Sequence, residues 1–283
     1  MIGCVVLNYN DADTTLDLLK RIEPMEIIDQ IVLVDNKSTD NSLERLKEQE
    51  SNKVHVVCAK KNGGYGSGNN VGIEYLRKNY SCDYIIIANP DVIFDESVIK
   101  KMVDKFDEDT VIVAPLTLDS KKERQLPIAW KVPTVKDYFL FSSIVLNKIF
   151  KPFQYPIQFF NTDICEVDCV QGCLFMLNNS LIEDKLYDEN IFLFFEESCI
   201  GKQFKDKGYK TKLLMNVDYI HNHSVSINKA FNSEARKRKI TLDSFYTYFE
   251  DYYSLSGFTK GIMRIYKKFI YIENYILLKI FFN

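Results

Sequence analysis

The 283-residue sequence lacks the patterns that mark several common protein classes. Its seven cysteines contain no CxxC pair, and its net charge of −3 gives no general basic surface for nucleic acid. Three cysteines, Cys165, Cys169 and Cys173, are spaced by four, but in a strand this spacing does not gather three thiolates. We therefore expect buried free thiols in a reducing compartment rather than a zinc site.

The sequence also shows no internal repeat, no low-complexity linker and no basic segment or cleavage site before its first apolar run. This start predicts no signal peptide and favours a cytoplasmic location. The length suits one large domain with a small appendage.

A glycine-rich loop at 62–70 resembles a dinucleotide-binding loop without matching its spacing. Counted from Gly64, the third glycine position holds Asn69, and counted from Gly66 it holds Val71, so a dehydrogenase is disfavoured. No Walker lysine pattern is present. One interpretation is that the loop approaches a phosphate or sugar closely, with Asn69 and Asn70 hydrogen-bonding to that ligand. The other is that these asparagines cap the following helix.

The first 115 residues alternate between strand and helix patterns, which predicts an α/β fold with a mostly parallel sheet covered by helices on both faces. Strands are predicted at 2–7, 31–34, 54–58, 84–88 and 111–114, and helices at 14–22, 42–49, 69–78 and 96–106. The region 119–165 is rich in proline and aromatic residues and predicts an irregular excursion with a helix at 136–150. Further on, we predict strands at 167–177 and 212–217, a helix at 196–207, and helices from 232 onward.

Polar residues follow each of the first four predicted strands, and ligands bind at the carboxyl ends of strands in an open parallel sheet. These residues are Asn8 and Asn10, Asp35 and Asn36, Asn62 and Gly64, and Asn89 and Asp91. Turn formation explains any one of them, because Asn, Asp and Gly are common in loops. Four polar strand ends in a row favour a binding site at one edge of the sheet.

Asp91 provides a carboxylate at this edge, in the sequence Asn89-Pro90-Asp91. Such a carboxylate suits Mg²⁺ or Mn²⁺ bridging a diphosphate, whereas the alternative is a simple proline-containing turn. His221 and His223 lie two residues apart, so both rings share a face of a strand-like segment. Either could complete a metal site with Asp91, or both could be surface residues.

Glu196 and Glu197 are adjacent acids at the start of a predicted helix. Acids there interact favourably with the helix dipole, which is a structural explanation. The functional alternative is a general base that deprotonates an acceptor hydroxyl, with a pKa raised by the surrounding aromatic residues.

The tail at 257–283 has the pattern of an amphipathic helix with a net charge of +4. Its apolar residues recur at helical spacing, at Phe258, Ile262, Ile265, Phe269, Ile272, Ile276 and Ile280. The charges disfavour a membrane-spanning helix, and a helix lying on an anionic membrane is one interpretation. The other is packing on the protein core or on the second subunit of a homodimer.

Together these motifs resemble the family-two inverting glycosyltransferases of the GT-A fold, and most closely the bacterial rhamnosyl- and galactofuranosyltransferases of surface polysaccharides. The resemblance covers about residues 2–230. The motifs that carry it are Val5–Asn10, Val34–Ser42, Asn62–Gly66 with Asn69-Asn70-x-Gly72, Asn89-Pro90-Asp91, Asp168-x-x-x-Gly172, Phe194–Glu197, and His221 with Ser226.

This resemblance implies a GT-A, Rossmann-like catalytic domain at 1–230, with a nucleotide-sugar half at about 1–115 and an acceptor half at about 116–230, followed by a helical extension at 231–283. It implies that Asp35 contacts the nucleotide, with Asn8 and Asn10 nearby. Asp168 and Gly172 are expected to line the sugar and acceptor region.

The resemblance further implies that Asp91 binds the metal, that His221 is an additional ligand, and that Glu197 is the base, preceded by Glu196. The expected reaction is a single in-line displacement on a nucleoside-diphosphate sugar, with a saccharide or lipid-linked saccharide as acceptor. The expected place is the cytoplasm, including the inner face of the membrane. By subgroup, dTDP-rhamnose is the first expected donor, and UDP-galactose, UDP-galactofuranose and UDP-glucose are alternatives.

The base motif departs from the subgroup, which usually has Glu-Asp-x-Asp where this chain has Glu196-Glu197-Ser198-Cys199. The second acid is longer and the last acid is missing. The competing hypothesis is therefore a catalytically impaired nucleotide-sugar-binding partner of another glycosyltransferase. A nucleotidyltransferase is disfavoured, because it needs a basic glycine-rich loop where this chain has Asn8-Tyr9-Asn10.

Overall fold

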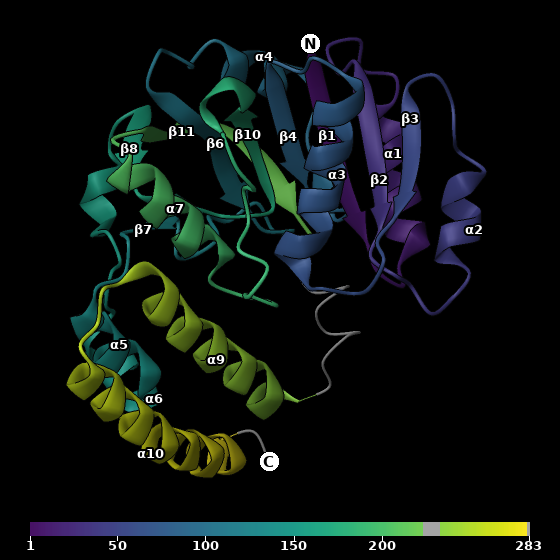
Figure 1. Ribbon diagram of the computed structural model, residues 1–283. Helices are drawn as coiled ribbons and strands as arrows, with labels where there is room; N and C mark the ends of the chain where they lie inside the picture. The colour runs from purple at the N-terminus through teal and green to yellow at the C-terminus, as the bar shows by residue number, and fades with distance from the viewer. Residues whose placement is uncertain (223–232, 282–283) are drawn as a thin grey trace.

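The computed structural model describes residues 1–222 and 233–281 (Figure 1). Within these residues, a nine-stranded sheet has the order β3-β2-β1-β4-β10-β6-β11-β5, with β8 paired to β11. The strands are β1 Ile2–Asn8, β2 Gln30–Asp35, β3 Val54–Cys58, β4 Tyr84–Ala88, β5 Val92–Ile93, β6 Thr110–Leu118, β8 Ile164–Val167, β10 Leu174–Asn178 and β11 Lys210–His221. A small second sheet pairs β7 (Ala129–Trp130) with β9 (Cys169–Val170).

The predicted α/β class is confirmed. Strands β3, β2, β1 and β4 run parallel, as do β6 and β11. β10 lies antiparallel between β4 and β6, and its first residue, Leu174, pairs with Ala88 at the end of β4. Because β10 enters the sheet where β4 leaves it, residues just before β10 lie at the same edge as those just after β4.

Helices cover both faces of the sheet, as the alternating pattern predicted. On one face pack α1 (Ala12–Ile22), α2 (Ser42–Lys47) and α4 (Glu96–Val103), through apolar side chains such as Leu18 and Ile99. On the other pack α3 (Tyr65–Asn79) and α7 (Glu196–Asp206), through Ile73 and Phe204. The strands between them are buried on both sides, which explains their nearly continuous apolar sequences.

A separate group of helices lies beyond the end of the sheet at which β1 finishes (Figure 1). It contains α5 (Val135–Ser142), α6 (Ile144–Phe150), α9 (Glu234–Tyr252) and α10 (Gly257–Phe281). An aromatic cluster joins α5, α9 and α10, with Tyr138, Phe245 and Phe249 all buried. The helical tail therefore shares its core with a segment of the excursion at 119–165. The predicted domain boundary at residue 230 lies outside the described residues.

The single helix predicted at 136–150 is wrong in detail, because Ser143 divides it into α5 and α6. Ser143 has an extended backbone, with φ −78° and ψ 129°, and its hydroxyl oxygen accepts a hydrogen bond from the backbone N–H of Leu146. The serine therefore begins a new helix, as N-cap residues do. The strand predicted at 212–217 is longer than expected and includes His221 as its last residue.

Candidate active site

Asn8 and Asp35, at the ends of β1 and β2, form a buried hydrogen-bonded pair at the sheet edge. The Asn8 side-chain amide donates to Asp35 Oδ2 at 3.1 Å and to the Ser38 hydroxyl at 3.2 Å. Asp35 Oδ1 accepts the backbone N–H of Ser38, and Asn10 Oδ1 accepts that of Thr39. These contacts fix the loop after β2 and leave Asn10 closer to the surface than Asn8.

The loop after β3 is tied to the same network. The Asn36 side-chain amide donates to Asn62 Oδ1 and to the Gly64 carbonyl, at 3.2 and 3.1 Å. Asn36 is 4% exposed, and within the described part of the chain its Oδ1 has no hydrogen-bond partner. Three predicted loops thus meet at one edge of the sheet, held by side-chain amides.

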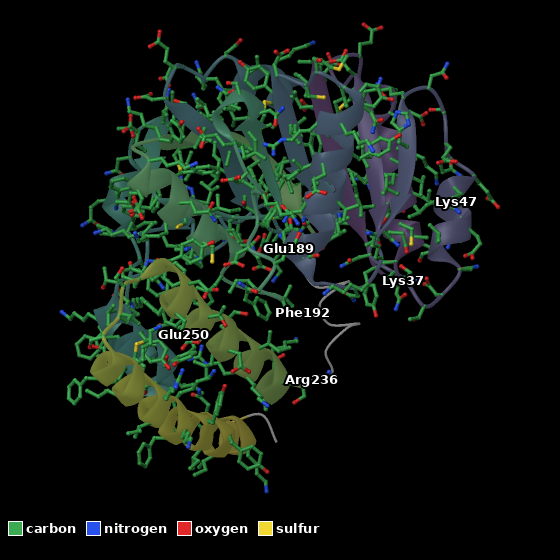
Figure 2. The ribbon with its side chains drawn as sticks, viewed as in Figure 1. Lys37, Lys47, Glu189, Phe192, Arg236 and Glu250 are labelled. Atoms are coloured by element: carbon green, nitrogen blue, oxygen red, sulfur yellow. The ribbon has the colours of Figure 1, made fainter. Side chains whose placement is uncertain are left out.

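Gly64 places the glycine-rich loop against the segment that precedes α7. Its φ of +96° suits glycine, and a Cβ at this position would collide with the Phe192 carbonyl oxygen. That same carbonyl accepts the backbone N–H of Tyr65 at 3.0 Å. Figure 2 shows Phe192 between the lower end of α3 and helix α9. The loop predicted for the donor and the loop that carries the acids are therefore in direct contact.

Gly66 and Gly72 of α3 allow close helix packing. A Cβ on Gly66 would meet the Tyr187 ring, and one on Gly72 would meet Val5 of β1, so α3 lies unusually close to its neighbours. Asn69 is 1% exposed and its amide donates to the Tyr65 carbonyl within α3. Asn69 thus lies on the face of α3 that packs inward, and its Oδ1 has no hydrogen-bond partner among the described residues.

A pocket of about 430 Å³ opens beside this contact. Five residues singled out by the sequence line it: Asn89, Gly172, Glu196, Glu197 and His221. Its other walls are largely aromatic or amide-bearing, and include Tyr65, Gln125, Trp130, Phe141, Phe153, Gln171, Phe194 and Phe195. Residues from the donor loops, the excursion and α7 therefore surround one space.

Glu197 occupies the pocket against Gly172. The Glu197 carboxylate packs where a side chain at Gly172 would stand, and it accepts a hydrogen bond from the Gly172 backbone. Burial raises the pKa of Glu197 above its ordinary value, and the Gly172 hydrogen bond opposes that rise. Gly172 thus lies at the site, as predicted, because only glycine leaves room for this carboxylate.

Glu196 has a different environment. It is 3% exposed, and its Oε1 has no hydrogen-bond partner among the described residues. Burial, followed by the nearby charge of Glu197, holds the pKa of Glu196 well above its usual range. Because Glu197 is the more exposed, it is the better placed of the two acids to meet a substrate.

The backbone before these acids is strained, with φ of 69° at Phe194 and 70° at Phe195. Helix α9 holds this conformation in place. Phe245 stacks on Phe195 with 4.3 Å between ring centroids, and the Ser244 hydroxyl donates to the Leu193 carbonyl at 2.7 Å. The start of α7 is therefore positioned by a helix some fifty residues further along the chain.

Asp91 and His221 form the pair expected to bind a metal. His221 Nε2 lies 3.2 Å from Asp91 Oδ1, and both side chains are nearly buried. Adjacent ligands of an octahedral Mg²⁺ or Mn²⁺ ion are about 3 Å apart, for ligand distances of about 2.1 Å. Burial lowers the pKa of His221, but hydrogen bonds with Asp91 and Cys173 raise it to about 10. A cation binding here would replace that proton.

Among the described residues, no group of three or more His, Cys, Asp or Glu side chains gathers as a metal-ligand set. Two protein donors still fit the chemistry, because Mg²⁺ commonly takes one or two protein ligands and completes its shell with substrate phosphates and water. His223, the alternative ligand, lies outside the described residues.

Asp168 differs from expectation, because it does not line the pocket. Its carboxylate accepts the backbone N–H of Val132 at 2.9 Å and pairs with Lys205 of α7 at 2.7 Å. It borders a separate small cavity with Tyr209 and Thr211. In this structure Asp168 fastens α7 to the excursion, and so supports the site from outside.

A family model for glycosyl transferase family 2 matches residues 4–183, more than half of the chain. The chain belongs to this family. The match ends before α7, so the environments of Glu197 and His221 come from the structure and not from the family match.

Two curated relatives of this glycosyltransferase differ in coverage. Low-salt glycan biosynthesis hexosyltransferase Agl10 of Haloferax volcanii is 23% identical over 226 residues, which is 79% of this chain and 68% of that protein. The dTDP-rhamnosyl transferase RfbF of Shigella flexneri is 30% identical over 128 residues, 45% of this chain and 42% of its own length. The similarity to RfbF therefore spans less than half of either protein.

Solved structures confirm the expected GT-A type of fold. The mannosyltransferase PcManGT of Pyrobaculum calidifontis, in complex with GDP-Man and Mn²⁺, has a TM-score of 0.58 at 14% identity, covering 96% of this chain and 70% of its own. GalNAc-T7 with UDP, GalNAc and Mn²⁺ has a TM-score of 0.62 at 16% identity, covering 88% of this chain and 48% of its own.

Several pocket residues of this glycosyltransferase were missed by sequence reasoning. The Tyr65 hydroxyl lies 2.9 Å from Asn89 Oδ1 and 2.8 Å from the Gly172 carbonyl oxygen, so these two acceptors share its one proton and two predicted motifs are joined. Trp130 donates its indole N–H to the Ser198 hydroxyl at 3.0 Å. Tyr65 could have been found as the aromatic residue inside the glycine loop, and Trp130 as the single tryptophan of the chain.

Proposed function

We propose that this glycosyltransferase moves a sugar from a nucleoside-diphosphate sugar to a hydroxyl group of a saccharide or lipid-linked saccharide, with inversion at the anomeric carbon. One observation carries the proposal. The Glu197 carboxylate lines the same pocket as Asn89 and His221, and the Tyr65 hydroxyl links the Asn89 turn to the Gly172 loop behind Glu197. A base and the diphosphate end of a donor therefore share one space.

Glu197 is the proposed general base. Burial raises the pKa of this carboxylate, which makes it a stronger proton acceptor for a hydroxyl group. The hydrogen bond from Gly172 fixes its direction, and the strained Phe195 backbone fixes the start of its helix. Such positioning would favour an acceptor hydroxyl in line with the bond to be broken.

At the other end of the pocket, Asp91 and His221 would hold Mg²⁺ or Mn²⁺ with the donor diphosphate. When bound, the metal would neutralise the charge that develops on the departing nucleoside diphosphate. Asp35, Asn36 and the loops they brace would bind the nucleoside, since they form the polar edge beside the pocket.

We propose dTDP-rhamnose as the first donor to test, supported by the 30% identity to RfbF. UDP-galactose, UDP-galactofuranose and UDP-glucose are the competing donors. We further propose a role in bacterial surface polysaccharide or capsule synthesis, supported by the glycan-biosynthesis name of the relative Agl10.

The decisive experiment measures donor hydrolysis and transfer for this panel with Mg²⁺ and Mn²⁺, using the native chain and Glu197→Gln. The glutamine still accepts the Gly172 N–H but cannot take a proton. We expect turnover to fall by about 10²–10⁴-fold while the donor dissociation constant changes little. Glu166→Gln, at an exposed position of β8, is the matched control. Undiminished transfer by Glu197→Gln would show that another group is the base.

The second candidate function is a nucleotide-sugar-binding partner with impaired catalysis. The observation behind it is that Ser198 binds Trp130 and that Cys199 is fully buried, where the subgroup has a further acid. Thermal stabilisation by a nucleotide sugar, without hydrolysis or transfer under any metal condition, would favour this alternative.

A further inference from the structure

The apolar stripe of α10 faces away from the protein. Its side chains are 42–79% exposed along five turns: Phe258 79%, Ile262 42%, Ile265 60%, Phe269 66%, Ile272 59% and Ile276 50%. The alternative prediction, that this stripe packs on the core of the same chain, is therefore wrong. Among the described helices, α10 included, none is long and apolar enough to cross a membrane.

A different side of α10 fixes its orientation. Met263, Ile270 and Asn274 are buried against the helices α5 and α9, and the Asn274 amide donates to the Ser142 carbonyl at 3.2 Å. Ile270 follows Met263 by seven positions and Asn274 follows Ile270 by four, so the three residues lie on one side of the helix, away from the exposed stripe. The helix cannot bury its apolar stripe by turning without breaking this packing.

Helix α6 adds a second set of exposed apolar side chains. Val145, Ile149 and Phe150 are 48%, 65% and 58% exposed, and α6 has no buried residue. The two helices are joined at the start of α6, where the Ser143 hydroxyl donates to Glu273 Oε1 at 2.7 Å. We call the exposed apolar side chains of the two helices the outer face.

The charge of α10 differs in sign from that of the remaining chain. The helix carries five basic residues and one acidic residue, a net charge of +4, whereas the whole chain has −3, so the other residues carry −7. Arg264 and Lys267 pair with Glu250 and Asp243 of α9. Lys268 and Lys279 are exposed on the side of the helix next to the apolar stripe.

We propose that the outer face docks on an anionic phospholipid bilayer, with α6 and α10 lying in the plane of the interface. Exposed isoleucine and phenylalanine side chains insert into the boundary of the acyl chains, and the flanking lysines meet anionic headgroups. A second copy of this chain fits less well, because a pairing of two outer faces would bring the exposed Lys268 and Lys279 of both copies together.

A second cavity lies between the active-site pocket and the residue that follows α6. It measures about 500 Å³, shares Leu126 and Pro127 with the active-site pocket, and extends to Lys151, the residue that follows α6. Its lining is mostly apolar, with Ile128 and Phe160 on its walls. A lipid-linked acceptor could thus approach from the bilayer, a consequence that rests on the proposed function, whereas the docking itself does not.

The test is flotation of the full chain with vesicles of phosphatidylcholine alone and of phosphatidylcholine with phosphatidylglycerol. We expect binding only with the anionic lipid, and weaker binding as the salt concentration rises. The double variant Ile265→Glu, Phe269→Glu should lower binding by about tenfold or more, and Lys268→Glu, Lys279→Glu should lower it on anionic vesicles. Ile164→Glu, an exposed isoleucine of β8, is the matched control and should bind as the native chain does.

The melting temperature and the hydrolysis of soluble donor should be unchanged in the outer-face variants, because these side chains touch neither the core nor the pocket. Equal flotation of the Ile265→Glu, Phe269→Glu variant and the native chain would overturn the proposal. So would a native dimer that the same variant converts to a monomer, which would assign the face to a second copy. If no donor is turned over but flotation follows the expected pattern, the proposed function fails while the docking stands.

Discussion

The two ends of the active site are held in different ways. At the donor end, Asn8 and Asp35 are the last residues of β1 and β2, and Asn36 follows β2 directly. These residues hydrogen-bond to one another or to the next loop. At the base end, Glu197 follows two strained residues that are held by Phe245 and Ser244 of α9. The donor end is built from neighbouring segments of the chain, and the base end depends on packing from a distant helix. Changes in each region should therefore have different effects.

Of the three variants proposed here, Phe245→Ala should have the largest effect on stability and on kcat. Phe245 is fully buried, so its truncation should cost about 3–5 kcal/mol of unfolding free energy. Loss of the stacking on Phe195 should also release the start of α7 and lower kcat, with donor binding little changed. Denaturant unfolding, transfer kinetics and donor titration would measure the three quantities. Equal losses of donor affinity and kcat would show that the two ends are not separable. Phe245→Leu, which retains much of the volume, should recover most of the stability.

Asn8→Ala should show the reverse pattern, in which donor binding weakens and kcat changes little. It leaves Asp35 Oδ2 and the Thr15 hydroxyl without their buried partner, at a cost of about 1–3 kcal/mol. We expect weaker donor binding, measured by calorimetric titration, and a nearly unchanged pH dependence of the transfer step, because Glu197 lies at the other end. Asn79→Ala, at the exposed end of α3, is a control for loss of an asparagine. A shifted pH profile in Asn8→Ala would contradict the separation.

Glu196→Gln should have the smallest effect, and it should be stabilising. The pKa of Glu196 in the folded protein is raised by burial, so the folded state holds its proton to higher pH than the unfolded state does. Ionisation therefore lowers stability as the pH rises above the ordinary glutamic acid value of 4.5 and through the raised pKa. The variant should melt on the order of 2 °C above the native chain at neutral pH, and at the same temperature below pH 4.5. A melting temperature lowered at neutral pH would indicate that the charged form has a stabilising partner.

The same contrast explains what the sequence could predict. Asn8, Asp35, Asn36 and Asn89 were found because each follows a strongly apolar strand, and parallel strands end together. Glu196 and Glu197 were found as paired acids at a helix start, but the strain at Phe195 was not, since it depends on Phe245 fifty residues away. Local pattern therefore identified the acids but not what holds them.

Three details required the structure for physical reasons. Asn69 lies on the packed face of α3, and the period of a short glycine-rich helix does not show which face is inward. Asp168 was placed at the site by its motif, but Lys205 and the Val132 N–H compete for its carboxylate. The apolar stripe of α10 was read correctly as a stripe, yet only the burial of Met263 and Ile270 shows that it faces outward.

The contact between Gly64 and the Phe192 carbonyl has a consequence for engineering. Exchanging residues 1–115 for the corresponding half of a relative is an obvious route to a new donor preference. The grafted half must have a glycine opposite Phe192. It must also supply a backbone N–H that donates to the Phe192 carbonyl. Otherwise the segment 187–195 has to be exchanged together with residues 1–115. The unit to be exchanged then consists of two separate stretches of sequence that lie side by side in the fold.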